Sequence, residues 1–204
     1  MHHLLVAVGA AALVAASAAA SQSITIGSGA AEACYEAARE RRTSQTALDE
    51  CDQAISGVLS SPDLVATHVN RGILHALKKD YSKALSDYDR AIKLDPDEPE
   101  AFLNKGLLLL RLESRDAEAL RLLNLALAYK TRMPALAYFA RGIAHEELGQ
   151  TAAAYRDYRQ AAALSPKWDL PIRELRRFRK KADFRAARSP HRRVSHGRGS
   201  SALG

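Results

Sequence analysis

The 204-residue sequence is poor in several residue types, and each shortage excludes a class of protein. Two Cys residues cannot build a cysteine-only zinc site or a scaffold of several disulfides. Only 6% aromatic residues and 11 Gly, beside abundant Ala, Leu, Arg and Glu, favour helices over a β-sandwich. Phosphate-loop, Gly-x-Ser-x-Gly, His-Glu-x-x-His and calcium-loop motifs are missing. We therefore predict a helical, non-enzymatic protein without a cofactor or a metal site.

Positive charge is concentrated at the C-terminal end of the sequence. The net charge is +7, but residues 173–204 hold 11 Lys and Arg against 2 acidic residues, whereas residues 1–172 hold 19 against 21. Residues 183–204 mix arginines with Ser, Gly, His and Pro and cannot bury enough apolar surface to fold. We therefore expect a disordered basic tail, whose arginines are Arg185, Arg188, Arg192, Arg193 and Arg198.

The first twenty residues are typical of an export signal. Residues 4–16 are apolar and are followed by small residues, Ala16-Ser17-Ala18-Ala19-Ala20, that fit the cleavage pattern. The apolar run is short for a membrane span, and no later run is longer. The first three residues lack Lys and Arg, so an uncleaved anchor or a disordered start is the alternative. We predict a signal peptide at 1–20, a linker at 21–28, and export to the periplasm or the cell exterior.

Export bears on Cys34 and Cys51. Each lies in an apparent amphipathic helix, at residues 32–41 and 44–55, with a short polar turn between them. Two antiparallel helices bring such positions face to face, and an oxidising compartment favours a disulfide. The alternative is two separately buried thiols.

A motif recurs three times in the middle of the sequence, with its Gly residues 34 and 36 positions apart. After each Gly come an Ala, a bulky residue and a second Ala at nearly constant spacing. Small residues at this spacing let two helices approach closely, and the bulky residue fills the gap. These positions are Gly72, Ala84, Tyr88 and Ala91; Gly106, Ala119, Leu123 and Ala126; and Gly142, Ala154, Tyr158 and Ala161.

This pattern resembles the tetratricopeptide repeat, a helix–turn–helix of 34 residues. Residues 65–98 and 135–168 match it well, including Pro96 and Pro166 after the second helix. Residues 99–134 match with an insertion near 113–115, and residues 29–64 form a weaker first copy without the Gly. The resemblance implies an all-α fold, an α-solenoid of about four helix–turn–helix repeats. Residues 169–182 follow as a capping helix with an apolar stripe.

In this family the first helix of each repeat lines a concave groove that binds peptides, so the resemblance implies an interaction scaffold with an unidentified protein or peptide partner. The groove would be mostly apolar, with Asn side chains to fix a peptide backbone. The alternative is that these side chains pack on each other or on the protein's own termini. By this analogy the groove residues are Val69, Asn70, Ile73, Leu103, Asn104, Leu107, Arg111, Phe139 and Ile143.

Two histidines and a run of aspartates complete the set of candidate residues. His68 and His75 occupy positions where the family carries aromatic side chains, and no third ligand is near, so we interpret them as packing residues rather than metal ligands. The Asp residues of 81–89 are interpreted as a solvated helix face with Lys79 and Lys83 in reach.

Two functional hypotheses follow. The first is a non-enzymatic scaffold of the cell envelope that binds a peptide or protein segment in the groove. The second is a peripheral binder of anionic lipid or acidic envelope polymer through the Arg-rich tail. Apart from Phe184, the tail has no aromatic residues interleaved with its arginines for base stacking, which argues against nucleic acid.

Overall fold

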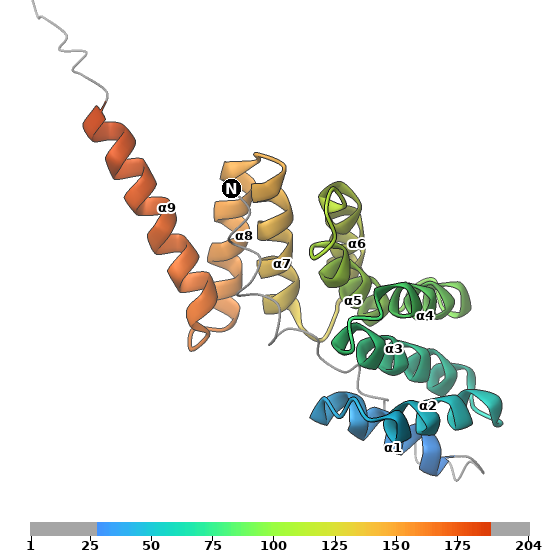
Figure 1. Ribbon diagram of the computed structural model, residues 1–204. Helices are drawn as coiled ribbons and strands as arrows, with labels where there is room; N and C mark the ends of the chain where they lie inside the picture. Colours follow the sequence, from blue (N-terminus) through green and yellow to red (C-terminus); the bar gives the residue numbers. More distant parts are fainter. Residues whose placement is uncertain (1–27, 189–204) are drawn as a thin grey trace, which may run out of the picture.

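The computed structural model describes residues 28–188, with side chains from 29 to 179, and the regular structure in this part is entirely helical (Figure 1). The helices pair in chain order into four antiparallel hairpins, and a longer helix follows. The pairs are α1 (Ser28–Glu40) with α2 (Gln45–Ser56), α3 (Ser61–Leu77) with α4 (Tyr81–Leu94), α5 (Pro99–Leu109) with α6 (Asp116–Ala128), and α7 (Pro134–Glu147) with α8 (Thr151–Leu164); α9 is Asp169–Arg188. The predicted all-α solenoid is confirmed.

Several helices begin where the local sequence satisfies their free backbone N–H groups. The side chains of Ser44, Ser60 and Asp80 each accept a hydrogen bond from a backbone N–H in the first turn of α2, α3 and α4. A Pro lies in the first turn of α3, α5 and α7, where its missing N–H costs nothing. These starts fix the hairpin boundaries by local chemistry alone.

The recurrent Gly positions are points where two helices of a hairpin nearly touch. A Cβ added to Gly72 would lie 2.6 Å from Cε1 of Tyr88, and one added to Gly142 would lie 2.6 Å from Cε1 of Tyr158. At Gly106 the nearest atom would be Cγ of Leu123, at 3.0 Å. Glycine is therefore required at the first two positions by the rigid ring that packs on it.

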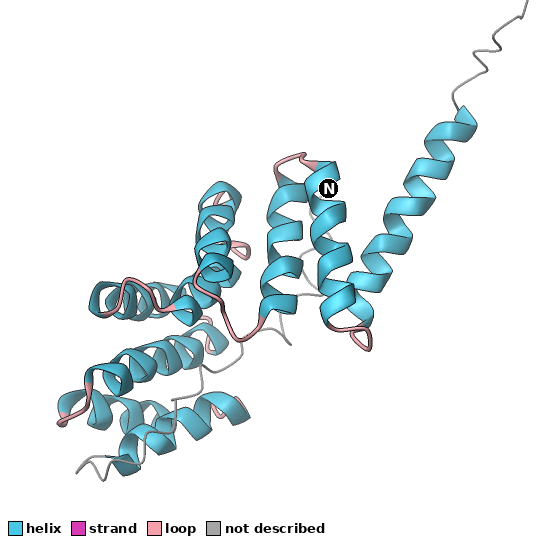
Figure 2. Ribbon diagram, turned by 180° about the vertical axis from the view of Figure 1, so that it is seen from behind, coloured by secondary structure: helices cyan, strands magenta, loops and turns pink. Residues whose placement is uncertain are grey.

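The core is divided into two clusters that meet at α5. The N-terminal cluster joins α1 to α4 and includes Ala101 and Leu108 from one side of α5. The C-terminal cluster joins α6 to α9 and includes Phe102, Leu103 and Leu109 from the other side. Figures 1 and 2 show the helices of α1–α4 lying across the view and those of α6–α9 standing more upright, so the array changes direction at α5 and α6.

The two ends of the array are closed differently. The predicted disulfide is present: Cys34 and Cys51, both fully buried, join α1 to α2. At the other end Trp168 packs on Phe139, with ring centroids 4.8 Å apart, and Phe178 of α9 covers Tyr158. These contacts seal the C-terminal cluster beneath α9.

The last helix is longer than predicted. It runs to Arg188, so residues 183–188, including Arg185 and Arg188, are helical rather than part of a disordered tail. After Pro171 in the first turn, the sequence of α9 holds no Gly or Pro as far as Arg188, so it contains no residue that would end the helix earlier. The predicted signal peptide and Arg192, Arg193 and Arg198 lie outside the described residues.

Within residues 28–188, no helix combines the length and the apolar character needed to cross a bilayer.

Candidate interaction surface

The nine predicted groove residues lie on or next to the first helices of three hairpins, but they do not form an open surface. Only Arg111, just beyond α5, is exposed; each of the others is less than a tenth exposed. They are also divided between the two clusters, with Val69 and Ile73 in the N-terminal one. Leu103, Leu107, Phe139 and Ile143 belong to the C-terminal cluster. The expectation of an open apolar groove is therefore corrected: these apolar side chains pack in the interior.

Two of the buried groove residues are polar and only partly satisfied. Asn70 is 2% exposed and Asn104 is fully buried. Asn104 Nδ2 donates to the carbonyl oxygen of Glu100 at 2.8 Å, but its Oδ1 accepts no hydrogen bond, and neither does Oδ1 of Asn70. An unpaired buried acceptor costs about 1–3 kcal/mol. These two oxygens, on neighbouring first helices, therefore have no hydrogen-bond donor among the residues that the structure describes.

Arg111, the exposed residue among the nine predicted groove residues, contacts an aromatic ring. Its guanidinium carbon lies 5.8 Å from the ring centroid of Tyr81, at the start of α4. This cation–π contact ties the end of α5 to the preceding hairpin. Arg111 is therefore exposed but held against α4 by the ring of Tyr81.

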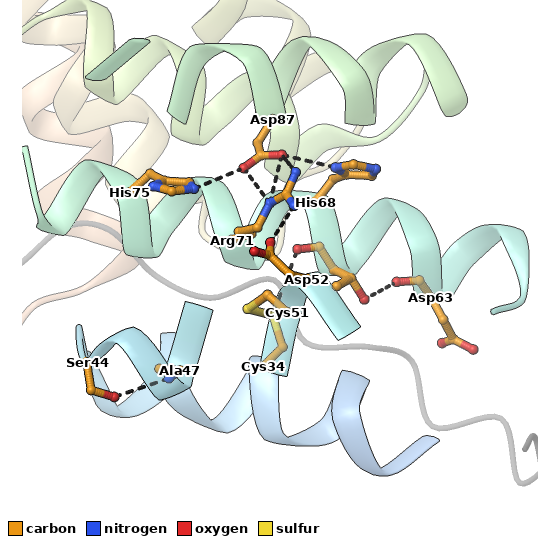
Figure 3. Close-up of a disulfide and its surroundings, with 11 residues drawn as sticks. Cys34, Ser44, Ala47, Cys51, Asp52, Asp63, His68, Arg71, His75 and Asp87 are labelled. Carbon is orange, nitrogen blue, oxygen red and sulfur yellow. Dashed lines mark hydrogen bonds and ion pairs between the residues drawn. A yellow bond between two sulfur atoms is a disulfide. The ribbon is translucent and has the colours of Figure 1, made fainter. Parts of the chain in front are cut away.

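A polar cluster that the sequence did not reveal surrounds Asp87, and we call it the Asp87 cluster (Figure 3). Arg71 Nη2 and Nε lie 2.6 and 3.0 Å from the two carboxylate oxygens, and His68 Nδ1 lies 3.1 Å from Oδ1. His75 Nε2 is 4.0 Å from Oδ2. Arg71 Nη1 also bonds Asp52 of α2 at 2.6 Å. One arginine of α3 thus links the preceding helix α2 to its own partner α4.

The interpretation of a solvated aspartate face is wrong for Asp87, which is 4% exposed. Burial alone would raise its pKa, but hydrogen bonds from His68 and Arg71 and the charge of Arg71 hold the pKa below its ordinary value. His75 shows the opposite balance: burial lowers its pKa, and the charge of Asp87 only partly offsets this. His68 therefore does more than pack, because its ring makes a hydrogen bond to a buried carboxylate.

The same arrangement recurs in the last hairpin. Arg141 Nε and Nη2 lie 2.7 and 2.8 Å from the carboxylate oxygens of Asp157, and His145 Nε2 lies 3.7 Å from Oδ2. Arg141 also bonds Asn124 of the preceding hairpin at 2.9 Å. The sequence carried a signal for this pairing, because Arg and Asp are 16 residues apart in both repeats.

An open pocket of about 370 Å³ adjoins the Asp87 cluster between α2, α3 and α4. Its cationic side chains already have partners: besides Arg71, Lys83 pairs with Asp80 at 3.2 Å and Lys78 donates to the carbonyl oxygen of Thr43 at 3.4 Å. Across residues 28–188, no cluster of three or more His, Cys, Asp and Glu side chains suits a metal ion. The pocket is thus bounded by internal ion pairs.

A second buried carboxylate, that of Glu100, was also not predicted from the sequence. Glu100, in the first turn of α5, is 3% exposed. It accepts hydrogen bonds from Thr131 Oγ1 at 3.0 and 3.1 Å and from the backbone N–H of Arg132 at 2.8 Å. These bonds hold the connection between α6 and α7, where the repeat pattern lacks its Pro. A single Glu without a repeated spacing gave no signal of this role.

Two parts of the chain match the model of the tetratricopeptide repeat family, at residues 65–98 and 135–168. The chain contains two tetratricopeptide repeats. Among curated proteins, none matches the sequence.

Several solved structures share the fold. PilW, described as a widely conserved type IV pilus biogenesis factor, is 24% identical over 80% of this chain and 72% of its own, with a TM-score of 0.67. A double mutant of MamA from RS-1 is 23% identical over 76% and 85%, with a TM-score of 0.61. The first TPR domain of human RPAP3 is 25% identical over 61% and 96%, with a TM-score of 0.54. Tetratricopeptide repeats generally build non-enzymatic scaffolds for protein–protein interaction, and the two repeats support that role for this chain.

Proposed function

We propose that the chain is a non-enzymatic adaptor of the cell envelope that binds a peptide or protein segment along α3, α5 and α7. The observation that carries the proposal is the pair of buried carboxamide oxygens of Asn70 and Asn104, to which no group in the described part of the chain donates a hydrogen bond. A segment that donates backbone N–H groups to them would remove the cost of two unpaired acceptors. Arg111 would meet the same segment at the exposed rim.

The flanking apolar side chains would supply most of the affinity by losing contact with water and with each other. Because they are buried in the absence of a partner, binding requires them to move. Changes of side-chain rotamer at an interface are common, and larger shifts occur in a minority of complexes. We therefore expect a slow association that becomes faster when the packing around Asn70 and Asn104 is loosened.

The test is a double variant, Asn70→Leu with Asn104→Leu, used beside the wild type to capture partners from an envelope extract. Removing an unpaired buried acceptor should leave the free energy of unfolding unchanged or higher. Capture of a specific partner should nevertheless fall at least tenfold. Gln160→Leu, which changes an exposed carboxamide on the second helix α8, is the matched control. Unchanged capture by a folded double variant would refute the proposal.

Export is the second part of the proposal. Its support is the signal-like segment at residues 1–20 together with the disulfide of Cys34 and Cys51, since disulfides persist in oxidising compartments. Intact mass measurement on the envelope fraction should find a mature chain beginning after Ala18 or Ala20 with no free thiol. A chain that keeps Met1 and two free thiols would contradict export.

A second candidate function is peripheral binding of anionic lipid or acidic polymer through the basic C-terminal stretch. Its support is the concentration of arginines in the sequence: Arg185 and Arg188 lie at the end of α9, and Arg192, Arg193 and Arg198 follow within ten residues. Deletion of 189–204 should weaken a salt-sensitive binding to anionic vesicles or polymer. Retention of full binding by the deletion variant would remove the tail from this function.

A further inference from the structure

The exposed sides of α8 and α9 carry a group of arginines that come before the basic tail in the sequence. We call them the α8–α9 basic face: Arg156, Arg159, Arg173, Arg176 and Arg179, all of them exposed. Arg156 and Arg159 are three residues apart and share one side of α8. Among the side chains described, at residues 29–179, one ion pair reaches this group: Asp169 lies 3.8 Å from Arg173, and both side chains are exposed. Such a pair adds little, so the face keeps its charge.

The α8–α9 basic face is held rigidly by contacts on its inner side. The ring of Phe178 lies 5.9 Å from that of Tyr155 and 5.7 Å from that of Tyr158. Arg177 bonds Glu146 of α7 at 2.7 Å and also pairs with Glu174. These contacts fix α9 to both α7 and α8, so the exposed arginines lie on two helices that are held in place relative to each other.

Charge separates this end of the molecule from the remainder of the array. Residues 151–188 hold 11 Lys and Arg against 4 Asp and Glu, a net charge of +7. Residues 28–150 hold 16 against 19, a net charge of −3. Two of the four acids in the basic part, Asp157 and Glu174, already pair with Arg141 and Arg177. The outer surface of α8 and α9 therefore presents uncompensated positive charge.

We propose that the α8–α9 basic face is a docking surface for an anionic phospholipid bilayer. The proposal deepens the second candidate function, because it moves the contact from the tail onto two folded helices. Figures 1 and 2 show α9 projecting from the body, and a helix of 20 residues is about 30 Å long, so it can lie along a plane. A planar surface of anionic headgroups is complementary to arginines spread along such a line.

The packing of α9 specifies the depth and the chemistry of this contact. In the part of α9 whose side chains are described, Leu175 and Phe178 are packed against the C-terminal cluster, so this part meets headgroups by charge and does not insert. Single-stranded nucleic acid would need exposed aromatic rings for stacking, whereas the rings of Tyr155 and Tyr158 each pack against that of Phe178. Binding should therefore be lost steeply as salt is raised.

The test is co-sedimentation of the full chain with vesicles of phosphatidylcholine alone or with about one quarter phosphatidylglycerol. The pure phosphatidylcholine vesicles measure any binding by the apolar run at residues 4–16. The face variant is Arg156→Glu, Arg159→Glu, Arg176→Glu and Arg179→Glu. The matched control carries the same change in net charge at four exposed cations of the other hairpins: Arg90→Glu, Lys93→Glu, Arg121→Glu and Lys130→Glu.

Each cation near an anionic membrane contributes about fivefold to the binding constant, so the face variant should bind phosphatidylglycerol vesicles at least ~100-fold more weakly. The binding constant of the control should change by about threefold or less at ~0.1 M salt.

Three outcomes would contradict the proposal. Equal losses of vesicle binding in both variants would show that net charge alone determines binding, and would overturn it. Full binding by the face variant, lost only on deleting 189–204, would overturn it while leaving the tail function standing. Binding to an acidic polymer or to nucleic acid without binding to vesicles would also overturn it. Circular dichroism of both variants establishes that they are folded.

Discussion

The middle hairpin, α5–α6, has its Gly and Ala residues at the same spacing as the hairpins on either side of it. The contacts that hold its two helices together are nevertheless different. In α3–α4 and α7–α8 a buried Asp bonds an Arg and lies near a His, and a Tyr packs on the Gly. The middle hairpin has apolar residues at most of the same positions. The equivalent sets are Arg71, His75, Asp87 and Tyr88; Lys105, Leu109, Leu122 and Leu123; and Arg141, His145, Asp157 and Tyr158.

This difference separates what the repeat needs from what each copy adds. Close approach of two helices is common to all three hairpins, because each has a Gly facing a bulky side chain. The ion pair is dispensable for the fold, since α5–α6 forms without it and Lys105 only reaches back to Asp89 of α4. Buried charges are therefore an addition to the two outer repeats, and the array changes direction at the hairpin that lacks them.

The largest expected effect comes from breaking the Asp87 cluster. Asp87→Ala leaves Arg71 and two histidines without their shared carboxylate, and it should lower the free energy of unfolding by about 3 kcal/mol. Leu122→Ala, at the equivalent position of the middle hairpin, removes a partly exposed apolar side chain and should cost about 1 kcal/mol. Urea unfolding of both variants measures the difference. Equal losses would mean that the buried charge contributes no more than an apolar side chain.

Most of the fold could be predicted because its determinants are local. The spacing of Gly, Ala and bulky residues gives the hairpins, and Pro and Ser residues mark where helices begin or end. The partner of Cys34 followed from there being one other Cys, 17 residues along. The end of α9 was missed because a high proportion of charge indicated disorder, although the same residues tolerate a helix.

The next expected effect tests the Gly positions. Gly72→Ala places a methyl group 2.6 Å from the buried ring of Tyr88, and the strain should exceed the gain in helix propensity by about 1–2 kcal/mol. Gly106→Ala meets Leu123 at 3.0 Å, where a flexible side chain can move aside, and should be neutral within about 0.5 kcal/mol. Thermal unfolding of the two variants measures this. A larger loss of stability for Gly106→Ala than for Gly72→Ala would mean that the Tyr88 ring is not the reason why glycine is required.

The candidate site was predicted less well because burial depends on neighbours that are distant in sequence. The groove analogy identified Asn70 and Asn104, but it treated the apolar residues around them as open surface, whereas they are in the two clusters. Asp87 has the same local pattern as a solvated Asp, and only its pairing with Arg71 on another helix distinguishes it. The recurrence of that pairing at Arg141 and Asp157 was the available signal.

A smaller effect distinguishes the two outer repeats from each other. Tyr158 Oη donates to Glu146 at 3.1 Å, so Tyr158→Phe should lower the free energy of unfolding by about 1 kcal/mol. Ala76 stands where Glu146 would be, and the buried Tyr88 Oη has no hydrogen-bond partner in the described part of the chain. Tyr88→Phe should therefore leave stability unchanged or raise it by about 1 kcal/mol. Chemical denaturation should therefore show a loss of stability for Tyr158→Phe and none for Tyr88→Phe, and equal losses would indicate a further hydrogen-bond partner for Tyr88.

The smallest expected effect is on pH dependence. Burial lowers the pKa of His75, so an unfolded chain takes up a proton near the ordinary value of about 6.5 while folded His75 stays neutral. Stability from this group is therefore present above about pH 6.5 and is lost as the pH falls through that value toward the folded pKa. His75→Leu, the residue found at the equivalent position 109, removes this loss. The variant should lose less stability than the wild type between about pH 7.5 and 5.5 in urea titrations.

The contribution of Asp87 can be told apart from that of His75 by its pH range. The pKa of Asp87 is also lowered, but its contribution to stability is lost only at more acidic pH, so the pH ranges of the two groups do not overlap. If the stability of the variant and of the wild type fell equally with pH, the other histidines would be responsible for the acid sensitivity. His75 would then contribute no more to the pH dependence than Leu109 does at the same position of the middle hairpin.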